Sequence, residues 1–311
     1  MKYMIKKCFT LITTLLIISF ITFLAFELIP GDPATSILGT SATPEKLEAL
    51  RKEMGLNAPF FVRYIDWIKG IFTGDLGISY SYQIPVKEML GDKILITGYL
   101  SALSFIIILL ISIPLGILSA RYSDTWIDKT FLTVNLSLMA IPEFFIGMIL
   151  TLIFGGILHF FTPGGFVSMK EGIGGFALYM IYPALAIALP RSAKTIKLLR
   201  TSIMEESDKE YVRTARSKGA GKTYVLFHHV LKNAFMPVVT FLGISITEIV
   251  ASSLIVEQVF SVPGLGRLLI TSISGRDYPV VQAIIMIIAI FIMVTNLVVD
   301  FIYRLLDPRL P

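Results

Sequence analysis

Two carboxylates lie in stretches that are otherwise apolar, and they are the first candidates for chemistry in this sequence. Glu143 follows a proline inside the apolar run 131–158, and Glu248 lies near the middle of another run, 235–258. An ionisable group at the centre of a bilayer costs roughly 2.5–3.5 kcal/mol on insertion scales, so each needs a function or a partner. The pattern predicts that Glu143, Glu248 and nearby Ser252 line a water-filled path. The alternative is that both carboxylates form hydrogen bonds inside a helical bundle and contact no substrate.

Residues that could suggest nucleotide or metal chemistry do not form a complete site. Residues 221–223 read Gly-Lys-Thr, like the end of a phosphate-binding loop, but Arg216 stands where that motif needs a glycine. His228 and His229 are adjacent, so on a helix they point about 100° apart and make a poor bidentate pair. We therefore expect no catalytic residue, no metal site and no bound cofactor, and we expect that the chain is not an enzyme.

The most polar stretch of the chain, residues 191–233, carries ten Lys and Arg against four Asp and Glu. Residues 207–208 (Ser-Asp) are good helix N-caps, and Gly219 tolerates the left-handed conformation that ends helices. The pattern predicts two helices, over about 208–218 and 223–234, joined at Gly219. From the residues alone, this hairpin is either a docking element for an acidic partner or a basic loop that only orients the chain.

The hairpin sequence resembles a known element. Residues 211–219 read YVRTARSKG and, nine residues later, 229–237 read HVLKNAFMP. On these residues the chain is similar to the permease subunits of ABC importers, in the branch that imports dipeptides, oligopeptides and nickel. The match rests on Ala215, Gly219, Leu231 and their spacing, because the chain has Arg-Thr-Ala where the general family pattern has Glu-Ala-Ala.

The resemblance extends along nearly the whole chain. The pieces IPGDP at 29–33, MGLNAPFFVRYIDWI at 54–68 and GDLGISY at 74–80 are similar to the external segment of the same branch. An outer loop that begins at residue 257 resembles the branch as well. The resemblance implies that this loop lies near the outer gate.

Four residues of that outer loop are candidates for shaping the gate. Glu257 closes the outer end of an apolar run, and Pro263, Gly264 and Gly266 predict a tight turn. A short amphipathic piece would follow this turn at the outer surface.

The composition is that of an integral membrane protein. Of 311 residues, 55% are hydrophobic and 16% are charged, and the mean hydropathy is +0.77. The single cysteine, Cys8, excludes a disulfide framework and a cysteine zinc site. The basic residues follow topology, so we expect membrane lipid and no nucleic acid as a partner.

Six apolar runs are long enough to span a bilayer as helices. They cover about 8–29, 94–120, 131–158, 176–199, 235–258 and 280–303. The first run could be a signal peptide, but it is too long and lacks a cleavage site, which favours a retained helix. We expect one transmembrane domain over 1–311, with an extracytoplasmic segment at 30–93 and the coupling loop at 205–232.

The distribution of basic residues orients these spans. With the N-terminus inside, the inner segments carry 17 Lys and Arg and the outer ones carry 10, mostly in the long segment 30–93. We expect a multi-pass protein of a bacterial or archaeal cytoplasmic membrane, with both termini and the coupling loop in the cytoplasm.

One helix of the external segment has an aromatic face. Phe60, Tyr64, Trp67, Ile68 and Ile71 recur at helical spacing. This face either lies in the headgroup layer or packs on the transmembrane helices, and packing is favoured.

The resemblance implies a type I ABC importer permease: an all-α polytopic protein with six transmembrane helices and a cytoplasmic coupling helix. Its partners would be a paralogous permease, two cytoplasmic ATPases that hold ATP and Mg²⁺, and an extracytoplasmic substrate-binding protein. The coupling residues would be Glu210, Arg213, Thr214, Ala215, Arg216, Gly219, Ala220 and Lys222.

The resemblance favours di- and oligopeptides as substrates, and nickel or a nickel chelate is the alternative. A different class, an ion-coupled secondary transporter with Glu143 and Glu248 carrying the ion, is less favoured because no inverted repeat is visible. A membrane-embedded enzyme would need a catalytic constellation that the sequence lacks.

Overall fold

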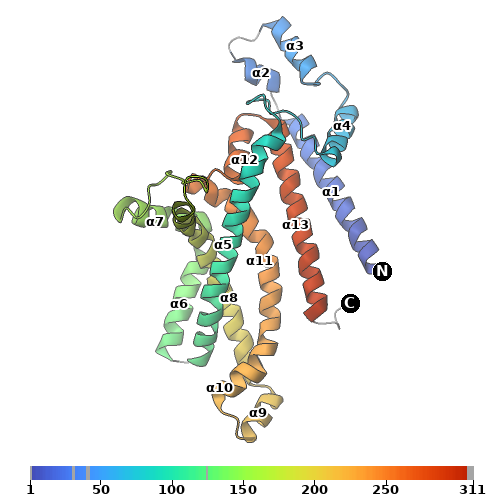
Figure 1. Ribbon diagram of the computed structural model, residues 1–311. Helices are drawn as coiled ribbons and strands as arrows, with labels where there is room; N and C mark the ends of the chain where they lie inside the picture. Colours follow the sequence, from blue (N-terminus) through green and yellow to red (C-terminus); the bar gives the residue numbers. More distant parts are fainter. Residues whose placement is uncertain (1, 30–31, 40–42, 124, 307–311) are drawn as a thin grey trace. The chain divides into compact units, whose positions relative to one another are not determined.

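The computed structural model describes residues 2–29, 32–39, 43–123 and 125–306, which form helices joined by turns and loops (Figure 1). The helices are α1 (Lys2–Leu28), α2 (Pro33–Leu38), α3 (Pro44–Glu53), α4 (Phe60–Thr73), α5 (Val86–Arg121), α6 (Trp126–Ala140), α7 (Glu143–Leu150), α8 (Ile173–Ser207), α9 (Glu210–Ser217), α10 (Lys222–Val225), α11 (Leu231–Val259), α12 (Leu265–Ser274) and α13 (Tyr278–Leu306). Two π-helical segments, Thr151–Ile157 and Leu226–Val230, follow α7 and α10. The all-α prediction is confirmed.

Five helical stretches in the described residues are long and apolar enough to cross a membrane. They are Phe9–Leu28, Val86–Arg121, Ile173–Ser207, Lys222–Val259 and Tyr278–Phe301. A sixth candidate, Trp126–Ala140 with Glu143–Ile157, is bent by 103°. The polytopic helical fold is therefore as predicted, with the third span broken.

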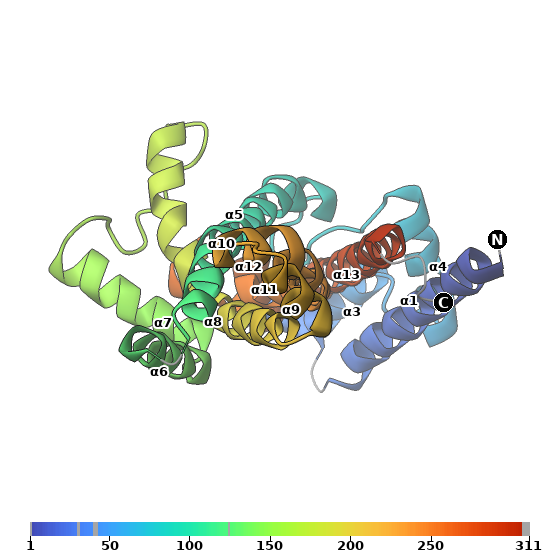
Figure 2. The same cartoon turned by 90° about the horizontal axis from the view of Figure 1, so that it is seen from below.

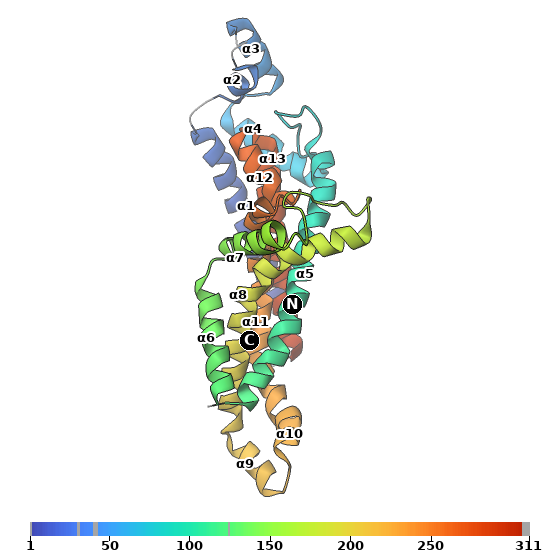
Figure 3. The same ribbon diagram turned by 90° about the vertical axis from the view of Figure 1, so that its left-hand side faces the viewer.

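The break falls inside the predicted span 131–158, directly before the proline that precedes Glu143. Ile141 is extended, with φ −90° and ψ 128°, and Pro142 stands just before α7. Proline lacks an N–H donor and disfavours a helical conformation in the residue before it, so α6 ends there. Figure 3 shows α7 turned across the line of α6.

The chain divides into two compact units. The first comprises residues up to Ile96 together with Pro263–Val294, and the second comprises Thr97–Val262 together with the end of α13 from Thr295. The single transmembrane domain stays a prediction.

In the first unit the aromatic face of α4 packs against α1. The ring of Phe23 lies 5.3–5.6 Å from the rings of Phe60, Tyr64 and Trp67. The Tyr64 hydroxyl is 2.9 Å from Oγ of Ser19. The predicted packing of this face on a membrane helix is confirmed.

The first unit also holds a cavity of about 650 Å³. Its lining includes Trp67, Tyr80 and Tyr278. Beside it, the backbone N–H of Tyr80 donates to the fully buried Asp277 at 2.9 Å. Burial raises the pKa of Tyr80 to about 12.

In the second unit α8 is the central helix, and it packs against α11, α6 and α7. Figure 2, seen along these helices, shows α6 on one side of α8 and α11 on the other. Small buried residues allow close approach: Ala184, Ala186 and Ala188 are fully buried on α8. Pro183 and Pro190 lie inside this helix without ending it, as other helices allow in a membrane.

An ion pair joins α8 to α6 near one end of the second unit. Nε of Arg200 donates to Oδ1 of Asp128 at 2.7 Å, and an Nη of Arg200 donates to Oδ2 at 2.5 Å. Oγ of Ser119 on α5 donates to the same carboxylate at 2.7 Å. Asp128 is 1% exposed, so buried, charge-assisted hydrogen bonds to one carboxylate join α5, α6 and α8.

Candidate functional site

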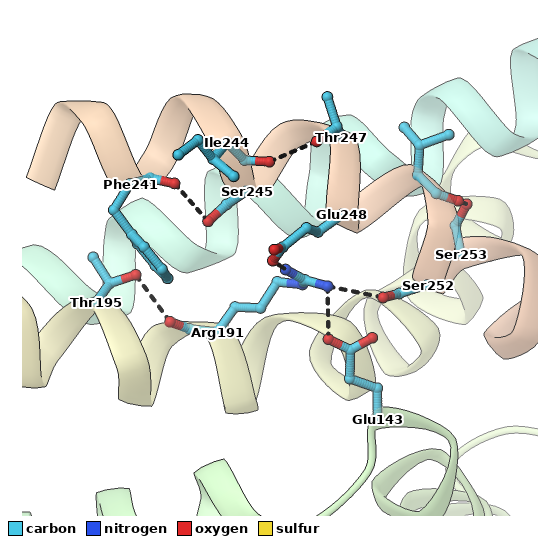
Figure 4. A network of polar contacts seen from close by, with 11 residues as sticks. Glu143, Arg191, Thr195, Phe241, Ile244, Ser245, Thr247, Glu248, Ser252 and Ser253 are labelled. Carbon is cyan, nitrogen blue, oxygen red and sulfur yellow. Dashed lines mark hydrogen bonds and ion pairs between the residues drawn. The ribbon is translucent and has the colours of Figure 1, made fainter. Parts of the chain in front are cut away.

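A second buried charge cluster is centred on Arg191 of α8. Nη2 of Arg191 lies 3.0 Å from Oε1 of Glu143, the first residue of α7. The same nitrogen donates to Oγ of Ser252 on α11 at 2.9 Å, and Nη1 donates to Oε2 of Glu248. Figure 4 shows the two carboxylates on opposite sides of the guanidinium. We call Glu143, Arg191, Glu248 and Ser252 the Arg191 cluster.

The structure thus brings together the three residues predicted to line a path, through a fourth that was not predicted. The Arg191 side chain is 7% exposed, Glu143 is 21% exposed and Glu248 is 50% exposed. Nε of Arg191 is buried and has no hydrogen-bond acceptor in the described part of the chain. A buried arginine needs charged partners because desolvation is costly, and the two carboxylates supply them. Whether the cluster lines a path stays a prediction.

The polar hairpin forms the other candidate site. It runs from the end of α8 through α9, turns at Gly219 and enters α10, at one end of the second unit (Figure 3). Gly219 has φ +85°, as predicted from its position after a helix. No atom lies within 4 Å of the place where its side chain would begin. The backbone conformation, and not crowding, is therefore what requires glycine there.

The predicted start of the first hairpin helix was wrong. The hydroxyl of Ser207 donates back to the carbonyl of Ile203 at 2.7 Å, and Asp208 follows the last turn of α8. Lys209 occupies the position before α9 and makes no side-chain cap. The reason is that α8 continues past the apolar run, so these residues end one helix instead of beginning the next.

The second arm of the hairpin is longer than predicted. Helical structure was expected to stop near residue 234, ahead of Pro237, but α11 runs through Pro237 to Val259. The π-helical segment Leu226–Val230 joins α10 to α11. The arm is thus one continuous helical stretch from the turn into the candidate membrane span.

Tyr211 ties the hairpin to both adjoining helices. Its hydroxyl donates to Oε2 of Glu206 at the end of α8 at 2.7 Å and accepts from Nδ2 of Asn233 on α11 at 3.1 Å. Lys209 pairs with the same Glu206, and Val212 beside Tyr211 is fully buried. Burial and the bond to the Glu206 carboxylate raise the pKa of Tyr211. The hydroxyl therefore stays protonated and able to donate.

Most predicted coupling residues lie on the open face of this hairpin. The carboxylate of Glu210 pairs with Arg213 at 3.0 Å, and both side chains are mostly exposed. Ala215 and Ala220 are half-buried, and the N–H of Ala220 donates to the carbonyl of Ala215 at 3.3 Å. The remaining predicted residues are exposed: Thr214, Arg216, Gly219 and Lys222.

Two family models match the chain, and together they cover nearly all of it. Residues 112–310 match the model of the binding-protein-dependent transport system inner membrane component, and residues 1–101 match the N-terminal model of this membrane component. The chain belongs to this family. The recognition of an ABC importer permease from the coupling hairpin is confirmed.

Relatives of the permease align over its full length. It is 33% identical to a probable peptide ABC transporter permease of Sinorhizobium fredii, over 99% of this chain and 98% of that protein. It is also 33% identical to the glutathione transport system permease GsiC of Escherichia coli K12, over 100% of this chain and 99% of that protein. A solved structure, an amino acid ABC transporter with histidines, matches with a TM-score of 0.52 and 19% identity over 70% of this chain and 94% of that chain. This last likeness shows the fold.

The outer loop of the permease differs in detail from the prediction. The left-handed position is Ser261, with φ +56°, and neither Gly264 nor Gly266 has a positive φ. Gly264 precedes α12, and Gly266 is buried inside it. The left-handed turn therefore lies before Pro263, directly after α11 ends at Val259. The predicted short helix after the turn is confirmed as α12, Leu265–Ser274.

Glu257 is fully buried near the end of α11. Its Oε1 accepts from the hydroxyl of Thr97 on α5 at 2.5 Å. This bond joins α11 to α5 within the second unit.

In the described residues of the permease, no group of three or more His, Cys, Asp or Glu could hold a metal ion. His228 stacks on Tyr224 with ring centroids 4.1 Å apart. Lys222 begins α10 directly after the turn, and a phosphate-binding loop would need a strand before it.

Sequence reasoning missed Arg191 and Tyr211. The polar stretch 191–233 was predicted to begin at Arg191, but α8 runs from Ile173 to Ser207, so Arg191 lies near the midpoint of a buried helix. The usable signal was the arginine itself within an apolar run, since such a group needs a carboxylate partner. Tyr211 gave no comparable signal, because its partners come from two other helices.

Proposed function

We propose that the chain is one of two permease subunits of an ATP-driven importer of di- and oligopeptides. The observation that carries this proposal is the basic α9–Gly219–α10 hairpin, which connects the candidate membrane spans Ile173–Ser207 and Lys222–Val259. The names of the relatives, a peptide permease and a glutathione permease, support peptides over the nickel alternative, since glutathione is a tripeptide.

The proposed partners are a paralogous permease, two cytoplasmic ATPases and an extracytoplasmic binding protein. ATP and Mg²⁺ would be held by the ATPases, and this chain would bind no cofactor and catalyse no reaction. Both termini and the hairpin would face the cytoplasm, as the excess of inner Lys and Arg indicates.

In this mechanism α9 seats in one ATPase, with the residues from Glu210 to Lys222 on the contact surface. Closure of the ATPases would displace α9, and the bonds of Tyr211 to Glu206 and Asn233 would pass that displacement to α8 and α11. Because α8 and α11 carry Arg191 and Glu248, movement of the hairpin would act on the cluster that we propose lines the path.

Substrate would reach this path through the outer gate, near Glu257, Pro263, Gly264 and Gly266. We propose that Glu143, Glu248 and Ser252 line the path together with Arg191. The position of this charged cluster between helices of apolar candidate spans supports that role.

The test is uptake by proteoliposomes that contain the full set of partners. Import of a labelled tripeptide should require ATP and both ATPases and should persist with an ionophore present. Uptake that stops with the ionophore but needs no ATPase would instead support an ion-coupled transporter. A parallel assay with Ni²⁺ tests the nickel alternative.

Two glycine variants test the hairpin itself. Gly219→Ala places a methyl group at φ +85°, whereas Gly221→Ala places the same group at φ −66°, and both positions are open. Only Gly219→Ala should lower the ATPase activity that depends on binding protein and peptide, with membrane insertion unchanged. Equal activity in the two variants would argue against a role for the hairpin in coupling.

A further inference from the structure

The Arg191 cluster carries more negative than positive charge. One guanidinium faces two carboxylates, Glu143 at 3.0 Å and Glu248 in a direct ion pair. The next cations along α8, Lys194 and Lys197, are exposed, and no hydrogen bond or ion pair joins them to the cluster. The cluster therefore holds one more acidic group than basic group, beside the hydroxyl of Ser252.

Glu248 is the more accessible of the two carboxylates. Half of its side chain is exposed, against about a fifth for Glu143. Its Oε2 accepts from Arg191, while no donor among the described residues reaches Oε1. Glu248 therefore presents one free carboxylate oxygen, while Arg191 holds the Glu248 side chain in place through the other oxygen (Figure 4).

We propose that Glu248, positioned by Arg191, receives the α-ammonium group of a peptide in transit. This inference rests on the proposed import of peptides and names the part of the substrate that the cluster contacts. An α-amino group has a pKa of about 7.7–8.0 and is mostly a cation at neutral pH. Linear peptides with a free N-terminus share this group whatever their side chains are, so one carboxylate suits substrates of varied sequence.

Arg191 also keeps the affinity of Glu248 for the ammonium group low. The ammonium must share Glu248 with a guanidinium that already donates to it. A transported substrate has to bind well enough to enter and weakly enough to leave. A carboxylate with a permanent internal partner meets both requirements better than an isolated carboxylate would.

The experiment uses the assembled transporter in nanodiscs and two photoreactive tripeptides. One carries a diazirine side chain on its first residue and the other carries it on its third, about 7 Å away along an extended chain. After illumination, adducts on this chain are located by mass spectrometry. The first-residue probe should label the helical turn around Glu248, or the facing part of α8, at least about tenfold more than the third-residue probe, since that separation exceeds one helical turn.

Glu248→Gln and Glu248→Asp separate charge from structure. Glutamine keeps the volume and can still accept from Arg191, but it lacks the charge, so the adduct yield should fall about tenfold, as for a lost hydrogen bond to a charged group. Aspartate keeps the charge and should stay within about threefold of the original yield. Glu88→Gln, an exposed residue at the start of α5, is the matched control and should change nothing.

The outcomes are distinct for the two proposals. Uptake of the probes with no adducts near Glu248, or with equal labelling by both probes, rejects the ammonium site and keeps the importer. Adducts at Glu248 without ATP-dependent uptake keep the site and reject the importer. If Glu248→Gln does not assemble, the position of the adducts on the unaltered chain decides alone.

Discussion

Charged residues behave differently in the two candidate regions of the second unit. Among the packed helices, Arg191 and Arg200 are largely buried; Arg191 pairs with two carboxylates from other helices and Arg200 pairs with one. On the hairpin, Arg213 pairs with Glu210 one turn away on the same helix, and both are exposed. The interior pairs fix how helices pack, whereas the hairpin pair leaves its charges available to a partner.

This contrast follows from solvation. A buried charge that loses its partner costs several kcal/mol, because water cannot replace that partner. An exposed pair contributes about 0–1 kcal/mol, because water and salt compete for both groups. The following substitutions test this difference, from the largest expected effect to the smallest.

Asp128→Asn should have the largest effect on stability. It leaves Arg200, which is 14% exposed, facing a neutral amide in place of a carboxylate that is 2% exposed. We expect a loss of roughly 3–5 kcal/mol in the free energy of unfolding, measured by thermal unfolding of the purified assembly. The control is Asp66→Asn, whose carboxylate is 65% exposed. Similar melting temperatures for the two variants would show that the buried pair does not clamp α6 to α8.

Arg191→Met should come next. It removes the shared partner of Glu143 and Glu248 and leaves the two carboxylates to repel each other. We expect the free energy of unfolding to fall by about 3 kcal/mol. This is the lower end for a buried pair, because Glu248 is half exposed and water can screen it. The yield of intact assembly, followed by size-exclusion chromatography, should fall for Arg191→Met and not for the exposed Lys194→Met. Equal yields would mean that the cluster is already hydrated.

Tyr211→Phe should have a smaller effect than the two preceding substitutions. We expect it to change the coupling of ATP hydrolysis to transport and not the stability of the assembly. The change removes one hydroxyl and so the bonds to Glu206 and Asn233. Because both bonds are exposed, together they contribute about 1 kcal/mol, and their loss shifts the equilibrium between the bonded and unbonded hairpin by a factor of about 5. Peptide imported per ATP hydrolysed should fall accordingly, while assembly stays intact. Tyr224→Phe is the control, since its ring stacks on His228; an equal fall in both variants would contradict a specific tie.

The parts of the structure that sequence could predict are local. Gly219 ends a helix, and its left-handed backbone follows from the residue type and its position. The aromatic face of α4 follows from helical spacing, and it packs on α1 as expected. The backbone of Gly219 and the position of the aromatic face on α4 each depend on neighbours within a few turns of the same chain segment.

The parts that sequence could not predict depend on distant residues. Glu143, Arg191 and Glu248 come from three different helices, and nothing in their spacing shows that they meet. The prolines show the same limit. Pro142 breaks a span, while Pro237 is absorbed within α11, because packing around each decides whether the freed backbone groups find other partners.

The smallest effect is expected for the exposed pair on the hairpin. Glu210→Gln and Arg213→Gln, made singly and together, should give a coupling free energy below about 0.5 kcal/mol in a double-mutant cycle on thermal stability. That coupling should fall further at high salt, since screening acts strongly on exposed charges. A value above about 1 kcal/mol that resists salt would mean that this face is covered in the isolated permease. The hairpin would then have to uncover these residues before an ATPase could contact them, and the contrast between the interior and the hairpin would not hold.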